Sequence, residues 1–198
     1  MKKIILASQS PRRKELLALA GYDFEIITSD VEEVITKVKP AEIAEDLSSQ
    51  KAEDVYNKII DMYGVDQGKE YLVIGADTIV SVGDEILGKP KDKDDAYRMI
   101  SMLQGRAHQV YTGVTLSYAG SDGKKTFSFS ECTEVICYSM TDEEIESYVN
   151  QSDDWADKAG AYGIQSTFAK YIKGIDGDYY NVVGLPIARL HQELKKID

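Results

Sequence analysis

Two short apolar runs constrain the fold of this chain more than any other feature of its sequence. Residues 3–7 (KIILA) and 71–76 (YLVIGA) lack the alternation of polar and apolar residues that marks a strand with one solvated face. Runs of this kind are typical of strands that are covered on both faces. We therefore expect a sheet with helices on its two sides.

Two helices are predicted from their termini and periodicity. Residues 11–20 follow Ser10, a suitable N-cap, begin with a proline, and end before Gly21. A longer helix is expected to begin near Pro40 and to run to about Tyr63, since Gly64 is a natural end.

The rest of the chain alternates between strands and helices. The expected elements are a strand at 24–28, a hairpin turning at Gly83-Asp84, a helix at 93–104, strands at 109–118 and 126–137 joined by a turn at 119–125, a helix opened by the capping box Thr141–Glu144, a glycine-rich stretch at 160–184 and a helix from Pro186. This order predicts an α/β fold with a mixed, twisted sheet and flanking helices. The length of 198 residues fits a single domain, residues 1–198, or a large lobe with a smaller appendage.

The composition narrows the class of partner. The chain is 43% hydrophobic and 29% charged, which is ordinary for a globular protein, and its formal net charge is −11. A nucleic-acid-binding protein needs a broad basic face, so we expect no nucleic acid partner. A small anionic substrate remains compatible, because one part of an acidic protein can be locally positive.

The cysteines and the apolar segments indicate a cytoplasmic protein. Cys132 and Cys137 form no CxxC motif, and the chain has only two histidines, so a structural zinc site is not expected. The apolar run after Met1 stops at Ser8, which is too short for a signal peptide. No segment has the length of a membrane span, so no membrane association is expected.

The first candidate site is the sequence SQSPRRK at the start of the helix 11–20. A helix N-terminus offers free backbone N–H groups and binds anions. Here Ser8, Ser10, Arg12 and Arg13 gather at that terminus, where positive charge opposes the helix dipole. A bound anion would relieve the conflict; the alternative is a capped surface helix with solvated arginines.

The second candidate is Lys51. It shares a four-residue spacing with apolar residues of the long helix, namely Ile43, Leu47, Val55 and Ile59. Lys51 therefore lies on the face expected to meet the core. Its side chain either extends to the protein edge or points into a polar site beside the core.

The third candidate is Asp77 in the sequence GADT, where the strand 71–76 is expected to end. Ligands of open α/β sheets bind beyond the carboxyl ends of strands, although a strand-end aspartate often only forms a turn. Glu32 and Glu33 follow another strand, and Lys89 and Lys91 follow Asp77 along the chain. Carboxylates for a hard cation and cationic groups for phosphate oxygens are what phosphoanhydride hydrolysis requires.

These motifs resemble the Maf family of nucleoside triphosphate pyrophosphatases along the whole chain. The matching stretches are LASQSPRRKELL at 6–17, VEE at 31–33, QKA at 50–52, VIGADTIV at 73–80, LGKPKD at 87–92, HQVYTGV at 108–114, DKAGAYGIQ at 157–165 and VVGLP at 182–186. The resemblance implies a fold like that of inosine-triphosphate pyrophosphatases, with two lobes around a cleft, and a homodimer.

The resemblance also implies a reaction and roles for individual residues. The reaction is cleavage of the α–β phosphoanhydride to a nucleoside monophosphate and pyrophosphate. Asp77 resembles the family's proton acceptor, and Glu33, Lys51 and Lys89 resemble its metal- and phosphate-handling residues. Our hypothesis is that Asp77 and Glu33 hold Mg²⁺ or Mn²⁺, while Arg13 joins the lysines and Arg12 in clamping the phosphates.

Three positions resemble the branch of the family that acts on dTTP and UTP: Arg12, Thr78 and Gln165. A glutamine amide offers one donor and one acceptor, which match O4 and N3–H of uracil or thymine. Ser166 departs from the glycine expected after Gln165, which leaves the base preference more open than the reaction. The competing hypothesis from another class is a nucleotide-binding regulator that senses a nucleotide without cleaving it.

Overall fold

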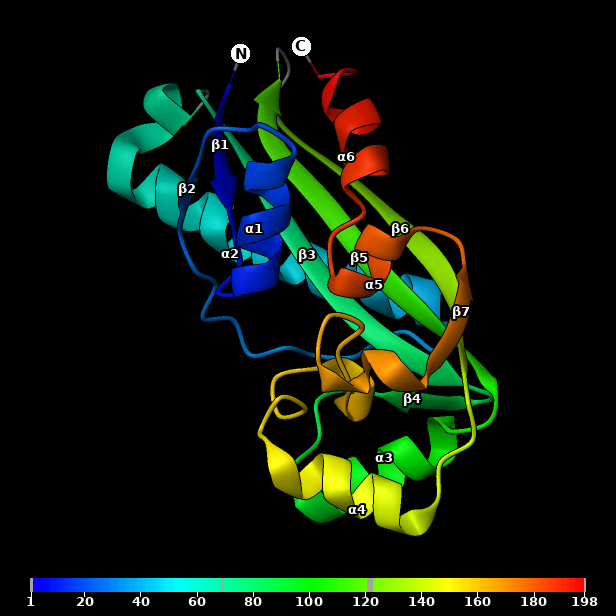
Figure 1. Cartoon of the computed structure of the whole chain (residues 1–198). Coiled ribbons are helices and arrows are strands. Elements are labelled where there is room, and N and C mark those ends of the chain that lie inside the picture. The colour runs from blue at the N-terminus through cyan, green and yellow to red at the C-terminus, as the bar shows by residue number, and fades with distance from the viewer. Residues whose placement is uncertain (1, 69, 121–122, 198) are drawn as a thin grey trace. The chain divides into compact units, whose positions relative to one another are not determined.

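The computed structural model of the chain describes residues 2–68, 70–120 and 123–197 (Figure 1). The elements are β1 (Lys3–Leu6), α1 (Pro11–Leu19), β2 (Phe24–Ile26), α2 (Pro40–Gly68), β3 (Tyr71–Val82), β4 (Glu85–Leu87), α3 (Lys93–Leu103), β5 (Ala107–Gly120), β6 (Gly123–Cys137), α4 (Asp142–Gln151), the 3-10 helices η1 (Ala159–Ala161) and η2 (Thr167–Tyr171), β7 (Ile172–Asp176), α5 (Tyr179–Val183) and α6 (Ile187–Leu194). The sheet order is β2-β1-β3-β5-β6-β7, and β4 pairs with β3. The sheet is mixed: β1 pairs in parallel with β2 and β3, whereas β4 is antiparallel to β3 and β7 is antiparallel to β6. The predicted α/β fold is therefore confirmed.

The chain forms two compact units. Unit 1 consists of Met1–Asp77, Thr112–Glu131 and Gly184–Asp198, and unit 2 of Thr78–Tyr111 and Cys132–Val183. The cleft between two lobes and the single domain stay predictions.

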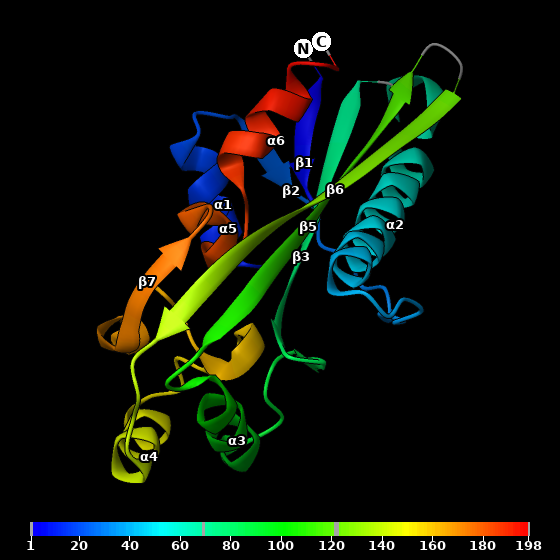
Figure 2. The same ribbon diagram turned by 90° about the vertical axis from the view of Figure 1, so that its right-hand side faces the viewer.

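In unit 1, helices cover both faces of the strands. Figure 2 shows α2 on one side of β1 and β3, and α1 with α6 on the other. Ile5 and Leu6 on β1, and Val73 and Ile74 on β3, are fully buried. The two apolar runs thus form strands covered on both sides, as their composition predicts.

Close approach of α2 to β3 depends on a glycine. A Cβ atom added at Gly75 would lie 2.8 Å from Cβ of Ala52 and would also overlap the backbone carbonyl of Ser48. Glycine at this position therefore lets α2 pack directly on the strand that carries Asp77.

The predicted helix termini are confirmed in unit 1. The side chain of Ser10 accepts a hydrogen bond from the backbone N–H of Arg13, which caps α1. After α1, Gly21 has a φ of 80°, the left-handed conformation that glycine adopts easily. Helical geometry in α2 is interrupted at Gly64, with φ 78° and ψ 163°, and a further turn continues to Gly68.

The predicted end of the strand at residue 76 is wrong. β3 continues without a break to Val82, so Asp77 lies inside a long strand. Its parallel pairing with β1 ends at Ile74, and its antiparallel pairing with β4 begins at Val80. The polar residues Asp77 and Thr78 lie between these two pairings, beyond the end of β1. The apolar residues after them continue the strand.

Unit 2 has its own core. Residues from α3, α4 and η2 join the ends of β3, β5 and β6 there, and α3 packs beside α4 (Figure 1). The capping box is confirmed, since both of its hydrogen bonds, between Thr141 and Glu144, are present.

Within the stretch 160–184 the structure also places β7 and α5, which the sequence did not predict. The sequence IKGID of β7 has too little apolar alternation to predict a strand. Ser121 and Asp122 of the predicted 119–125 turn lie outside the described residues.

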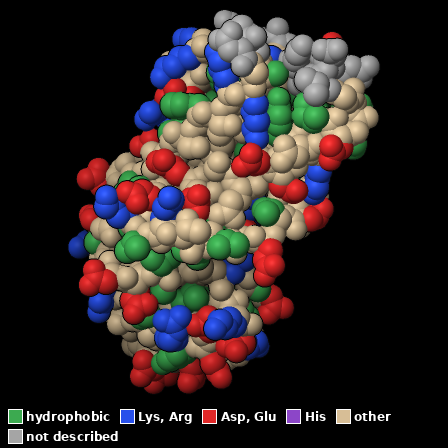
Figure 3. All heavy atoms as spheres, turned by 180° about the vertical axis from the view of Figure 1, so that it is seen from behind, with side chains coloured by type: hydrophobic (Ala, Val, Ile, Leu, Met, Phe, Trp, Pro, Cys, Tyr) green, Lys and Arg blue, Asp and Glu red, His purple; other side chains and the backbone are tan. Residues whose placement is uncertain are grey.

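The surface carries mixed charge. On the face in Figure 3, acidic and basic side chains of the described residues are interspersed. Among the residues described, no helix is both long and apolar enough to cross a membrane.

Candidate active site

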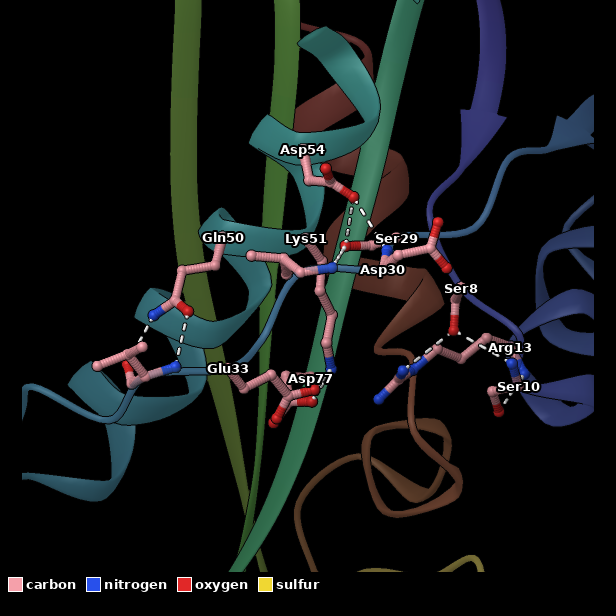
Figure 4. A network of polar contacts seen from close by, with 12 residues as sticks. Ser8, Ser10, Arg13, Ser29, Asp30, Glu33, Gln50, Lys51, Asp54 and Asp77 are labelled. Carbon is pink, nitrogen blue, oxygen red and sulfur yellow. Dashed lines mark hydrogen bonds and ion pairs between the residues drawn. The ribbon is translucent and has the colours of Figure 1, made fainter. Parts of the chain in front are cut away.

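Lys51 joins two carboxylates in unit 1 (Figure 4). Its ammonium group donates a hydrogen bond to Oδ1 of Asp77 and lies 2.9 Å from Oε1 of Glu33. The side chains of Lys51 and Asp77 are only 16% and 13% exposed, whereas that of Glu33 is 47% exposed. Lys51 therefore points into a polar site beside the core and does not extend to the protein edge.

Packing of α2 places Lys51. The apolar residues that share its helix face are all buried, namely Ile43, Leu47, Val55 and Ile59. Because this face meets the sheet, Lys51 is carried to the surface of β3, where Gly75 permits close packing two residues before Asp77.

The end of β1 places Asp77. β1 ends at Leu6, which pairs with Ile74, and Asp77 lies three residues farther along β3. The rule that ligands bind beyond the carboxyl ends of parallel strands thus applies to β1 rather than to β3. Ser8 and helix α1 follow β1 along the chain.

The N-terminus of α1 forms the second part of the site (Figure 4). Arg13 donates through Nε to the carbonyl oxygen of Gly184 at 2.9 Å and through Nη1 to Oγ of Ser8 at 3.2 Å. The backbone N–H of Ser10 donates to the same Ser8 hydroxyl at 3.2 Å. These contacts fix the guanidinium beside the first turn of α1, where half-buried Arg12 also lies.

The electrostatic surroundings of Arg13 link the two parts. The pKa of Arg13 is lowered, mainly because the side chain is buried. The negative charges of Asp77 and Glu33 raise this pKa, and the positive charge of Arg12 lowers it further. A guanidinium stays protonated in spite of such a decrease. Arg13 is therefore a fixed positive charge within the field of both carboxylates.

The other predicted residues belong to unit 2. Thr78 is half-buried on β3, and Lys89 is exposed after β4. Gln165 is exposed in a turn that is closed by a 3.0 Å hydrogen bond from the backbone N–H of Ser166 to the carbonyl oxygen of Gly163. The Ser166 hydroxyl caps η2, so the departure from glycine has a structural use.

A sequence profile described as Maf-like protein matches residues 3–197. The chain belongs to the Maf family. It is 50% identical over 203 residues to the dTTP/UTP pyrophosphatase of Agathobacter rectalis, which covers all of this chain and 98% of that protein. It is 48% identical over 199 residues to a protein of the same name from Bacillus cereus strain G9842, covering 100% of this chain and 97% of the relative. A third, from Carboxydothermus hydrogenoformans, is 49% identical over 194 residues, with 98% of each chain covered.

The carboxylates of this Maf chain fit a cation that is bound together with a phosphate. Asp77 and Glu33 converge on one ammonium nitrogen, which shows that their oxygen atoms can surround a single positive charge. Among the described residues there is no group of three or more histidine, cysteine, aspartate or glutamate side chains that could hold a metal ion. Mg²⁺ is commonly bound by one or two carboxylates and completed by substrate phosphates and water, and this pair matches that arrangement.

One feature of the Maf site was missed at the level of sequence. A polar stripe runs along α2 next to the apolar stripe, and its residues are four positions apart: Asp46, Gln50, Asp54 and Lys58. Their partners lie in the segment between β2 and α2 that carries Glu33. The spacing was visible in the sequence, but the partners were not.

Proposed function

We propose that this chain is a nucleoside triphosphate pyrophosphatase that hydrolyses dTTP and UTP to the monophosphate and pyrophosphate. The observation that carries the proposal is the convergence of Asp77 and Glu33 on Lys51, in the field of Arg13. The names of the relatives from three bacterial species support the choice of substrate.

Charge balance explains why such a site takes a triphosphate together with a cation. Arg13 and Lys51 carry two positive charges, which the two carboxylates offset. A triphosphate adds several negative charges, so further positive groups are needed. Arg12 and Lys89 supply two of them, and a divalent cation, Mg²⁺ or Mn²⁺ held by Asp77 and Glu33, would supply the rest and polarise the phosphate oxygens.

The chain's own residues then handle the phosphates and a proton. The positive end of the α1 dipole, with Ser8 and Ser10, binds phosphate oxygens. Asp77 accepts the proton of a water molecule whose oxygen forms a bond to the α-phosphorus. The bond from that phosphorus to the bridging oxygen breaks, and pyrophosphate leaves with its charge balanced by the lysines and arginines.

Base preference is assigned to Thr78 and Gln165. Gln165 is exposed at a turn, where its amide is available to donate one hydrogen bond and accept another. That pattern matches O4 and N3–H of uracil and thymine.

The decisive experiment is the substitution Asp77→Asn. We expect this variant still to bind UTP, while pyrophosphate release falls by about 10³-fold, as is typical when a general base is removed. Asp61→Asn, an exposed carboxylate on α2, is the matched control and should keep full activity. Turnover by Asp77→Asn equal to that of the control would contradict the proposal.

A substrate panel distinguishes the enzyme from its rival. Pyrophosphate release from canonical and modified triphosphates, measured with EDTA and after addition of Mg²⁺ or Mn²⁺, should be greatest for dTTP and UTP and should require the metal. Binding without turnover of any triphosphate would favour a nucleotide-sensing regulator.

The assembly state is part of the same proposal. We expect a homodimer, as resemblance to the Maf family implies. Light scattering coupled to size-exclusion chromatography should give twice the mass of one chain, and the mass of one chain would contradict the dimer.

A further inference from the structure

The segment that carries Glu33 has little apolar packing to hold it. Residues 27–38, between β2 and α2, are neither helix nor strand, and every residue from 30 to 39 is exposed. Ile27 at its start packs against the core, but the apolar side chains after residue 30 are exposed: Ile35 is 62% and Val38 88% exposed. Polar contacts must therefore determine where Glu33 lies.

Gln50 holds the backbone next to Glu33 (Figure 4). Its Oε1 accepts a hydrogen bond from the backbone N–H of Val34 at 3.0 Å, and its Nε2 donates to the carbonyl oxygen of Val34 at 2.8 Å. The same amide group donates to Asp46 at 3.1 Å, which fixes its orientation. Gln50 thus pairs with both backbone groups of the residue that directly follows Glu33.

A second anchor lies on the other side of Glu33. Asp54 accepts hydrogen bonds from the Ser29 hydroxyl at 2.8 Å and from the backbone N–H of Asp30 at 3.0 Å. Burial acts to raise the pKa of Asp54, but the hydrogen bonds from Lys58, Ser29 and the Asp30 backbone outweigh it and leave the pKa lowered. The carboxylate therefore stays ionised and keeps these bonds at neutral pH.

Both anchors belong to the helix that carries Lys51. Gln50 precedes Lys51 in the sequence, so one turn of α2 presents the ammonium group to Glu33 and, from the adjacent residue, holds the backbone of Glu33's neighbour. Any shift of this turn moves both groups together. Gln50 thereby ties the backbone beside Glu33 to the helix turn that carries Lys51.

We propose that Gln50 is a positioning residue of the active site, which sets the Glu33 carboxylate against Lys51 and Asp77 by holding the backbone of Val34. This inference rests on the proposed function, because it acts through the role of Glu33 in handling the triphosphate. Gln50 itself touches no substrate.

The test is a double-mutant cycle. Gln50→Leu keeps the size of the side chain and removes both hydrogen bonds to Val34, and it should lower kcat/KM for UTP about tenfold, because small displacements of a catalytic group are costly. In a Glu33→Gln background the same substitution should change kcat/KM by less than about twofold, since the group that it positions is gone. Equal losses in both backgrounds would overturn the proposal, since Gln50 would then act independently of Glu33.

Two further variants guard against a general structural effect. Gln151→Leu removes a helix-surface glutamine that bonds to a residue one turn away on α4, and it should match the unsubstituted protein. Gln50→Glu keeps the acceptor for the Val34 N–H but loses the donor, and it should fall between the parent and Gln50→Leu.

Hydrogen exchange separates this inference from the proposed function. Exchange of the Val34 amide should become about five- to tenfold faster in Gln50→Leu, the effect of losing one hydrogen bond, and should not change in Gln151→Leu. Unchanged exchange in Gln50→Leu would refute the anchor whether or not the protein hydrolyses UTP. Faster exchange in a protein with no turnover would leave the anchor in place and contradict the proposed function alone.

Discussion

Lys51 in unit 1 and His108 in unit 2 are both titratable side chains of the interior, but their surroundings differ. Lys51 forms ion pairs with two carboxylates. His108 is fully buried, and its hydrogen-bond partner is the neutral hydroxyl of Tyr162, 2.7 Å from Nε2. Burial lowers the pKa of His108 to about 4 and raises that of the neighbouring core residue Cys137 to about 12, so both stay neutral.

The difference separates a site from a core. Neutral buried groups satisfy each other at little cost, which is what a stable interior requires. Partly buried ion pairs lose much of their Coulomb energy to desolvation, so they are a poor choice for stability alone. The charges around Lys51 are therefore best explained by a charged ligand, and the buried pair of His108 and Tyr162 by packing.

The largest effect on stability is expected in the core of unit 2. Phe168 is fully buried, and its ring contacts those of Tyr148, Tyr162 and Tyr171. Phe168→Ala should lower the free energy of unfolding by about 3–5 kcal/mol, measured by urea denaturation. Phe127→Ala, at a position 41% exposed, should lower it by less than about 1 kcal/mol. Similar losses for the two variants would show that this aromatic cluster is not the centre of the core.

The next effect is on activity and belongs to unit 1. Lys51→Met removes the charge between the two carboxylates, and kcat/KM for UTP should fall by about 10²–10³-fold, the usual cost of removing one electrostatic contact to a reacting group. Lys173→Met, at an exposed position on β7, serves as the control and should keep its activity. If Lys51→Met retained turnover, the ion-pair cluster would have to be regarded as structural.

How far the sequence predicts these regions depends on the range of the interactions. Local signals were sufficient for the capped helix starts at Ser10 and Thr141 and for the break at Gly64, because each depends on neighbours within one turn. The apolar stripe was sufficient to predict that Lys51 faces the core. β7 was missed because IKGID owes its strand conformation to its pairing with β6.

The position of Asp77 was predicted for a reason that was partly wrong. The residue is central to the candidate site, but it lies inside β3, and the strand that ends there is β1. The role of Gln50 had no signal in the sequence beyond its spacing from Asp46 and Asp54 and its place in the matching stretch QKA. Its partner is the backbone of an exposed segment with no periodicity, which only the folded chain brings to α2.

A pH titration tests the neutral interior of unit 2. The pKa of His108 in the folded chain, about 4, is below the ordinary value of 6.5, so the unfolded chain binds an extra proton between these values. The stability that depends on neutral His108 is therefore fully present above pH 6.5 and decreases as the pH falls toward 4. At pH 5 the loss should be about 2 kcal/mol, which is 1.36 kcal/mol for each of about 1.5 pH units. We expect the unfolding free energy of the His108→Gln variant to fall less between pH 7 and pH 5 than that of the unsubstituted protein, by this amount. If both proteins lost the same free energy over this range, His108 would have to be solvated.

The smallest effect concerns the hydroxyl group of Tyr162. Its ring packs edge-on against His108, with ring centroids 5.3 Å apart, and Tyr162→Phe keeps this contact while it removes the hydrogen bond to Nε2. Among the residues described, Nδ1 of His108 has no hydrogen-bond partner, so the variant would leave both ring nitrogens unsatisfied in the interior. The unfolding free energy at pH 7 should fall by about 1–2 kcal/mol. Because the cost comes from the imidazole that is left behind, it should nearly vanish in a His108→Leu background, where no buried nitrogen remains. If Tyr162→Phe lowered the unfolding free energy by the same amount in the His108→Leu background, the Tyr162 hydroxyl would have to interact with a group other than His108. The neutral pair of His108 and Tyr162 would then not explain why this core contains a tyrosine.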